Sequence, residues 1–141
     1  MPNRSIWSPS RTRLRIPRIP ARVETLCDFA ESEGIAVLWS HDQLEPARWH
    51  EVPRIIVARA DLTADTTVSV IAHELGHWWN SDWCSSPAAE RRAWRFAGAL
   101  LIDPREYAEA EWHQSSPGAI ARHLGVLTDV IDGYRAYLEA A

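Results

Sequence analysis

The stretch His73-Glu74-Leu75-Gly76-His77 constrains this chain more than any other part of it. In an α-helix, residues four positions apart lie on the same face, so His73 and His77 can offer ring nitrogens to one tetrahedral metal ion. Glu74 lies one step around the helix, where its carboxylate can take a proton from a water molecule that zinc acidifies. The motif therefore predicts a Zn²⁺ site, with peptide hydrolysis as the leading reaction. The alternative is a structural pair of surface or core histidines.

The residues before and within the motif favour a helix from about Thr66 to Trp79. Apolar residues recur there at three- and four-residue spacing, as expected for one buried helix face. This stripe consists of Val68, Ile71, Ala72 and Leu75. Candidate N-terminal caps precede it at Thr63, Asp65 and Thr66. The helical context supports the metal interpretation over the structural one.

The bulk composition indicates one folded domain. The chain has 141 residues, of which 46% are apolar and 24% are charged, and this is typical of a globular protein that buries a core without disulfides. No apolar run approaches the roughly 20 residues that cross a bilayer. Cys27 and Cys84 are far apart and form no CxxC pattern, so we interpret them as reduced thiols. The N-terminus lacks the apolar segment of a secretory signal, and we expect a cytoplasmic protein.

Charge is divided unevenly along the chain. Residues 1–22 hold six arginines and no acid, whereas the remaining residues hold nine arginines and nineteen acids. Four prolines within residues 1–20 disfavour a helix there. We interpret residues 1–20 as a basic arm, solvated or loosely docked, and residues 21–141 as a single zincin-like domain. The arm could contact nucleic acid or any acidic surface, including the rest of its own fold.

The segment before the motif predicts a helix followed by a small sheet. Residues 21–33 have helical periodicity and end at Gly34, and two short apolar runs at 35–39 and 54–58 are typical of strands. Residues 40–53 have no clear period and predict a loop with room for a third strand, so His41 and His50 are interpreted as loop histidines. Of the two predicted strands, we expect 54–58 to be the edge strand that lines the cleft and pairs with an extended substrate.

A second helix, predicted over residues 88–102, supplies the candidate third metal ligand. Its apolar stripe consists of Ala93, Phe96, Ala97, Leu100 and Leu101. Extended backwards by three residues, the stripe reaches Glu90, and a carboxylate on a buried face is costly unless it is paired or binds metal. We therefore predict that His73, His77 and Glu90 bind zinc and that water takes the fourth position. In the alternative, Glu90 is a first-turn glutamate that is stabilised by the helix dipole or pairs with a nearby arginine.

Three other residues are weaker candidates for the third ligand. Asp82 is acidic and close in sequence, but it follows the zinc helix directly, where a cap is needed. His113 and His123 have no spacing that points to the site. Glu90 thus remains the predicted ligand.

These residues resemble the ImmA/IrrE family of small metallopeptidases, whose gluzincin-like core joins a HExxH helix to a glutamate on the next helix. The resemblance rests on three stretches, namely 70–77, 90–97 and the Leu100-Leu101 pair before Pro104. The order of elements fits from about residue 21 to 138. Asp103, an extra residue before the proline, and the bulky Trp78-Trp79 pair depart from the family pattern, and neither touches a proposed ligand. The resemblance implies a protein substrate, typically a DNA-binding repressor encoded beside the peptidase in a phage, an integrative element or a stress-response operon.

The C-terminal segment has the outline of a helix-turn-helix. Residues 119–124 predict a short helix, Gly125-Val126 a turn, and Thr128 the cap of a helix that reaches about Leu138. A DNA-reading helix carries basic or amide side chains, whereas this one has one arginine against three acids, namely Arg135 against Asp129, Asp132 and Glu139. Packing, or contact with a partner protein, is favoured over DNA recognition. The alternative function is a non-catalytic, zinc-containing regulatory or DNA-binding module that uses this segment and the basic arm.

Together these patterns predict an α+β fold. In this fold a small mixed sheet packs on the HExxH helix and on the glutamate-bearing helix, and a C-terminal helical segment completes the core. The predicted activity is that of a zinc-dependent endopeptidase, with Glu74 as the catalytic base.

Overall fold

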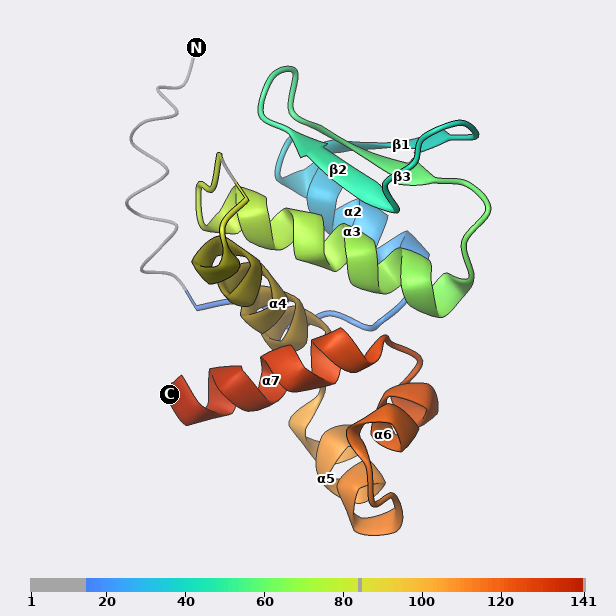
Figure 1. Cartoon of the computed structure of the whole chain (residues 1–141), viewed down its shortest axis with the longest axis vertical. Helices are drawn as coiled ribbons and strands as arrows, with labels where there is room; N and C mark the ends of the chain where they lie inside the picture. Colours follow the sequence, from blue (N-terminus) through green and yellow to red (C-terminus); the bar gives the residue numbers. More distant parts are fainter. Residues whose placement is uncertain (1–14, 84, 141) are drawn as a thin grey trace.

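The computed structural model describes residues 15–83 and 85–140 and has the predicted α+β architecture, a small sheet above a set of helices (Figure 1). The elements follow one another as α2 (Val23–Ser32), β1 (Ala36–Ser40), β2 (Ala47–His50), β3 (Ile55–Arg59), α3 (Ala64–Trp79), α4 (Pro87–Leu101), α5 (Pro104–His113), α6 (Pro117–Leu124) and α7 (Thr128–Ala140). Helix α3 begins two residues earlier than predicted, because the side chain of Thr63 caps it by accepting from the backbone N–H of Thr66.

The sheet has three strands in the order β1-β3-β2, so the prediction of 54–58 as the edge strand is wrong. β3 lies in the middle, paired in parallel with β1 and antiparallel with β2. β2 forms within the segment predicted as a loop with room for a third strand, and His50 belongs to this strand rather than to a loop. Strand order follows from long-range pairing, and local sequence patterns carry no information about it. The edge of the sheet next to α3 is therefore β2.

Helices α2 and α3 cover the same face of the sheet, and the main core lies between them. Ile56 of β3 faces this layer and is fully buried against side chains such as Leu26 of α2 and Ile71 of α3. Burial of one such side chain stabilises the fold by about 1.5–3 kcal/mol. This packing holds α3 rigidly beneath the sheet.

Helices α3 and α4 approach each other closely at Gly76, the glycine of the HExxH motif. A Cβ atom at this position would lie 2.6 Å from the carbonyl oxygen of Ala93 and 2.7 Å from its Cα atom. Both distances are shorter than real Cβ contacts, so only glycine fits without a shift of one helix. The close approach brings the beginning of α4 next to the histidines of α3.

Helix α5 was not predicted from the sequence. Asp103 and Pro104 directly follow the helix predicted over residues 88–102 and are typical of a helix end, but they also begin the next helix. The Asp103 carboxylate accepts hydrogen bonds from the backbone N–H groups of Arg105 and Glu106, and Pro104 occupies the first turn. Between α4 and α5 only Ile102 and Asp103 are non-helical.

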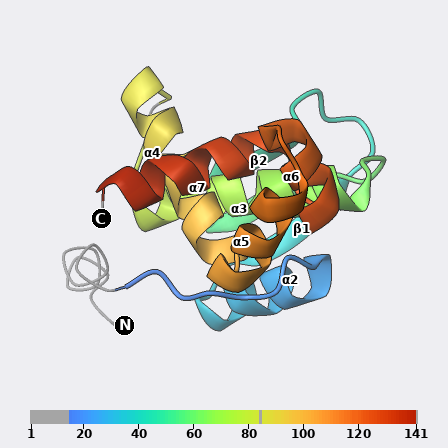
Figure 2. The same cartoon turned by 90° about the horizontal axis from the view of Figure 1, so that it is seen from below.

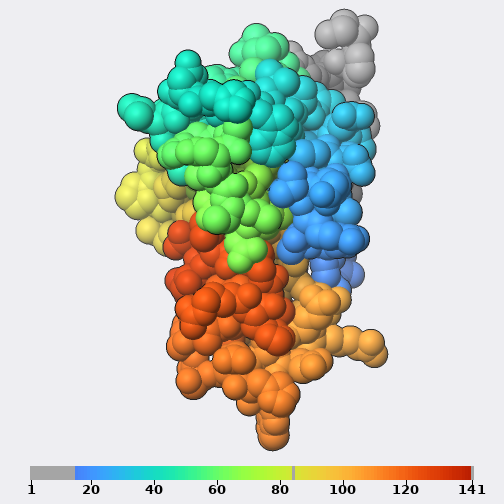
Figure 3. All heavy atoms as spheres, turned by 90° about the vertical axis from the view of Figure 1, so that its right-hand side faces the viewer, coloured from blue at the N-terminus to red at the C-terminus, as the bar shows by residue number. Residues whose placement is uncertain are grey.

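The helix-turn-helix outline exists, but its second helix is part of the core. Gly125 ends α6 with φ 74°, in the left-handed region. α7 packs along α4 so tightly that a Cβ atom on Gly133 would overlap the backbone of Trp94. Val130, Ile131 and Tyr134 are buried in this contact. Seen from below and from the side, α5, α6 and α7 form one end of the molecule (Figures 2 and 3). The predicted preference for packing agrees with this arrangement.

The described part of the basic arm, residues 15–20, lies against the helices. Ile16 and Ile19 pack on the core, and the N–H of Ile19 donates to the carbonyl of Leu100 over 2.9 Å. Residues 1–14 of the predicted arm, and Cys84, lie outside the described residues. Cys27 is a free thiol, and half-burial, together with nearby acids, raises its pKa. None of the helices in the described ranges is long and apolar enough to cross a membrane.

Candidate metal centre

The two motif histidines lie side by side on α3, as predicted from their spacing. Their ring centroids are 4.7 Å apart and the ring planes are at 85° to each other. Both side chains lie mostly out of solvent, with exposed fractions of 12% for His73 and 11% for His77. Both residues belong to α3, whose neighbouring side chains Ala72, Leu75 and Trp78 are buried, so helix packing places the two rings together.

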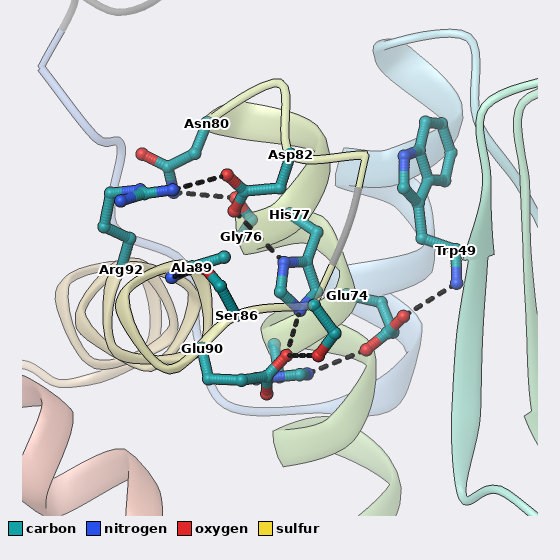
Figure 4. A network of polar contacts seen from close by, with 12 residues as sticks. Trp49, Glu74, Gly76, His77, Asn80, Asp82, Ser86, Ala89, Glu90 and Arg92 are labelled. Carbon is teal, nitrogen blue, oxygen red and sulfur yellow. Dashed lines mark hydrogen bonds and ion pairs between the residues drawn. The ribbon is translucent and has the colours of Figure 1, made fainter.

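Glu90, from the first turn of α4, lies between the two histidines. One of its oxygens is 2.7 Å from Nε2 of His73, and the other is 3.0 Å from Nε2 of His77 (Figure 4). Ser85 donates a hydrogen bond to the carboxylate over 2.9 Å. These partners of Glu90 are two histidines and a serine, rather than the arginine of the alternative interpretation. Two imidazole nitrogens and one carboxylate thus converge from two helices, a donor set that fits Zn²⁺.

Two carboxylates compete for the third position in this set. His73, Glu74 and His77 can each place one donor atom within 4.8 Å of the other two, and so also form a possible metal group. However, Glu74 touches His73 through Nδ1, at 2.7 Å, whereas Glu90 faces the Nε2 atoms of both histidines. One ion bound by both Nε2 atoms therefore finds Glu90 already in place. Glu74 stays free for another role.

The charges of the cluster favour cation binding. Burial alone would lower the pKa of His73, but hydrogen bonds and negative charge from Glu74 and Glu90 outweigh it and raise this pKa. Burial would raise the pKa of Glu90, but the hydrogen bond from Ser85 and the two histidines hold it below its usual range. The carboxylates thus already attract a positive charge, and a metal ion could replace the proton on His73.

Glu74 faces an open cleft of 410 Å³ that runs between β2 and the start of α4. Its second oxygen accepts a hydrogen bond of 2.7 Å from the backbone N–H of Trp49, a residue of β2 (Figure 4). Because this N–H points to Glu74, it points away from β3. The outer edge of β2 therefore borders the cleft that contains His73, His77 and Glu90.

The weaker ligand candidates lie elsewhere or face another way. His113 and His123 are exposed on α5 and α6 and do not line the cleft. Asp82 lines the cleft but contacts Nδ1 of His77, on the other side of the ring from Glu90. Sequence patterns missed this contact and the amide of Trp49. The only signal for Asp82 was a carboxylate five residues after the second histidine.

Comparison with protein families supports the metallopeptidase interpretation. The model of the Peptidase_M78 family, described as the IrrE N-terminal-like domain, matches residues 30–133. The chain belongs to this family. The match spans the sheet, both helices of the candidate site and the first half of α7, so the resemblance inferred from the motifs is confirmed. No curated protein and no solved structure shows a significant match. Family membership supports a peptidase-type function that depends on a metal.

Proposed function

We propose that this protein is a zinc-dependent endopeptidase in which His73, His77 and Glu90 hold the metal ion. The observation that carries the proposal is the position of the Glu90 carboxylate, whose two oxygens lie 2.7 Å and 3.0 Å from the Nε2 atoms of the two histidines. Two histidine nitrogens and one carboxylate oxygen are typical ligands of catalytic zinc sites, which keep the fourth position open for water or substrate.

Glu74 is the proposed catalytic base. Zinc, when bound, polarises the substrate carbonyl and makes a water molecule a better nucleophile. Glu74 takes the proton from this water and gives it to the leaving amine. Its side chain is 12% exposed and is oriented on one side by the Trp49 N–H. This backbone donor holds one oxygen of the carboxylate in a fixed position beside the cleft.

β2 is the proposed docking strand for the substrate. As an edge strand, it has no strand partner on the side that borders the cleft, and its Trp49 N–H donates to Glu74 on that side. An extended peptide can add to such an edge by main-chain hydrogen bonds, which are independent of the peptide's sequence. A peptide on this edge would pass directly over Glu74 and the histidine pair. This geometry suits cleavage within an extended segment of a protein.

We propose a DNA-binding repressor as the substrate, with both proteins in the cytoplasm. This part of the proposal rests on the family to which the chain belongs, whose resemblance implies such a partner. The alternative of a DNA-binding module loses support, because the buried face of α7 packs on α4 and the exposed residues of α7 include Asp129, Asp132 and Glu139.

The test compares cells that express the wild-type protein with cells that express Glu74→Gln. Both also express the repressors that are encoded beside the gene of this protein. New protein N-termini are identified by mass spectrometry, and purified repressor is then incubated with zinc-loaded enzyme. Because general acid–base catalysis contributes on the order of 10²–10⁴-fold, the variant should cleave at least about 100-fold more slowly. Zinc content should stay unchanged. Cleavage at equal rates by both proteins, or no new N-termini with the wild type, would contradict the proposal.

A further inference from the structure

Asp82 occupies an unusual position in the loop between α3 and α4. Its side chain is only 7% exposed, although the loop itself lies at the surface beside the cleft. A buried carboxylate is costly unless its oxygens have partners. Both oxygens of Asp82 have one: Oδ2 lies 3.1 Å from Nδ1 of His77, and Oδ1 accepts a bond of 2.8 Å from Nη2 of Arg92 (Figure 4).

Asp82 and Glu90 contact opposite nitrogens of the His77 ring. Oδ2 of Asp82 lies 3.1 Å from Nδ1, and an oxygen of Glu90 lies 3.0 Å from Nε2. With a metal ion bound at Nε2, the ring hydrogen would be on Nδ1, which would donate it to the Asp82 carboxylate. The backbone N–H of Asp82 also donates to the carbonyl of His77 over 2.9 Å, which ties the loop to the end of α3. Asp82 thus restricts the orientation of the His77 ring and turns its Nε2 atom toward Glu90.

The same geometry argues against Asp82 as a direct ligand of the ion between the histidines. The two nitrogens of an imidazole ring point in divergent directions, and Asp82 takes the one that faces away from Glu90. An ion bound at Nε2 of His77 is therefore out of reach for this carboxylate in the observed arrangement. Its action on the metal passes through the ring.

Arg92 connects this contact to the second helix of the site. It lies two residues after Glu90 on α4, and its guanidinium group bonds the buried oxygen of Asp82. The chain from His77 through Asp82 to Arg92 therefore spans α3, the loop and α4. It joins the helix that carries the histidines to the helix that carries Glu90, independently of the backbone contact at Gly76.

We propose that Asp82 and Arg92 are a positioning pair that raises metal affinity without touching the metal. Hydrogen bonding by a carboxylate makes a ligating imidazole more basic and restricts its rotation, and loss of such a partner typically costs about 10–100-fold in metal affinity. Arg92 holds the Asp82 carboxylate in place through the 2.8 Å contact with Oδ1. The inference rests on the proposed metal site and adds residues to it that lie outside the HExxH motif and Glu90.

The test measures zinc affinity by competition with a chelator, together with the absorption spectrum of the cobalt-substituted protein. Asp82→Ala should weaken zinc binding about 10–100-fold and alter the cobalt spectrum, because His77 is free to rotate. Asp82→Asn keeps the shape of the side chain but removes its charge, so its zinc affinity should fall less than that of Asp82→Ala. Arg92→Ala should lose part of the zinc affinity, and Arg92→Lys should lose less than Arg92→Ala. Glu45→Ala is the matched control, since Glu45 lines the same cleft and its carboxylate forms an ion pair with the exposed Arg48 rather than with a residue of the proposed metal site.

The outcomes separate this proposal from the function on which it rests. A wild-type protein that binds no zinc would overturn both. Normal zinc affinity and an unchanged cobalt spectrum in Asp82→Ala, beside a wild type that binds zinc, would overturn the positioning pair alone. A complete loss of zinc in Asp82→Ala with full binding in Glu90→Ala would make Asp82 a direct ligand and would contradict the proposal. A merely structural role would lower the melting temperature of the metal-free variants and leave the cobalt spectrum unchanged, which would also overturn it.

Discussion

The two helices of the candidate site support it in different ways. α3 contributes two histidines from the second half of a buried helix, with side chains that are 12% and 11% exposed. α4 contributes Glu90 from its first turn, next to a surface loop, and this side chain is 37% exposed. Helix geometry places the backbones of both histidines on one face, and Asp82 restricts the ring of His77, whereas the glutamate depends on how one helix packs on another. Substitutions that change the packing or capping of the two helices should therefore affect the α4 side more.

Removal of a ligand should have the largest effect, and it should differ between the two helices. His77→Ala and Glu90→Ala should each reduce zinc affinity by on the order of 100-fold or more, since loss of a direct ligand exceeds the 10–100-fold typical of outer partners. His77→Ala should lose more, because Glu90→Ala leaves both histidines on a rigid helix. Chelator competition measures both values. A larger loss in Glu90→Ala would reverse the comparison.

A substitution at Gly76 should affect both the fold and the site. In Gly76→Ala the new Cβ atom would meet the Ala93 backbone at 2.6 Å, so one helix has to move. Such overpacking costs about 1–3 kcal/mol of unfolding free energy, and zinc affinity should fall because Glu90 moves with α4. Denaturant unfolding and zinc titration check the two effects.

Gly118→Ala is the control for this prediction. The nearest atoms to a Cβ there are 3.7 Å away, and the residue lies on α6, away from the cleft. We expect little change in unfolding free energy and none in zinc affinity. If Gly76→Ala changes the unfolding free energy and the zinc affinity as little as this control does, then α3 and α4 do not approach each other as closely as described.

The smallest effect should come from the helix caps, which can be removed from α3 and α4 one at a time. Thr63 caps α3 and Ser86 caps α4, each through a side-chain oxygen that accepts a backbone N–H. Replacement of either by alanine should cost about 1 kcal/mol of stability. Only Ser86→Ala loosens the turn that carries Glu90, so only this variant should bind zinc a few-fold more weakly. Equal zinc affinities in the two variants would show that α4 needs no such support.

Sequence periodicity was sufficient for the parts of the site that lie on helices. The four-residue spacing predicted that His73 and His77 share a face, and the apolar stripe of the next helix led to Glu90. Both inferences use only local regularity, which the helix imposes on the side chains. The structure brings these three residues together, and their role as metal ligands remains a prediction.

The features that were missed depend on contacts between distant residues. The place of β2 at the sheet edge follows from pairing with β3, and the role of Asp82 follows from contacts with His77 and with Arg92 of α4. α5 was missed for another reason, since Asp103-Pro104 ends one helix and begins the next. Helix ends and helix starts are marked by some of the same residue types, so the sequence at such a boundary is equally consistent with a loop after the first helix and with the start of a second helix.

Diffraction at the zinc absorption edge from crystals grown with zinc would test the central claim most directly. The account predicts one anomalous peak about 2.0–2.2 Å from Nε2 of His73, Nε2 of His77 and an oxygen of Glu90. It also predicts that Asp82 stays hydrogen-bonded to Nδ1 of His77. A peak coordinated by Glu74 or Asp82 in place of Glu90, or no peak in the cleft, would contradict the account.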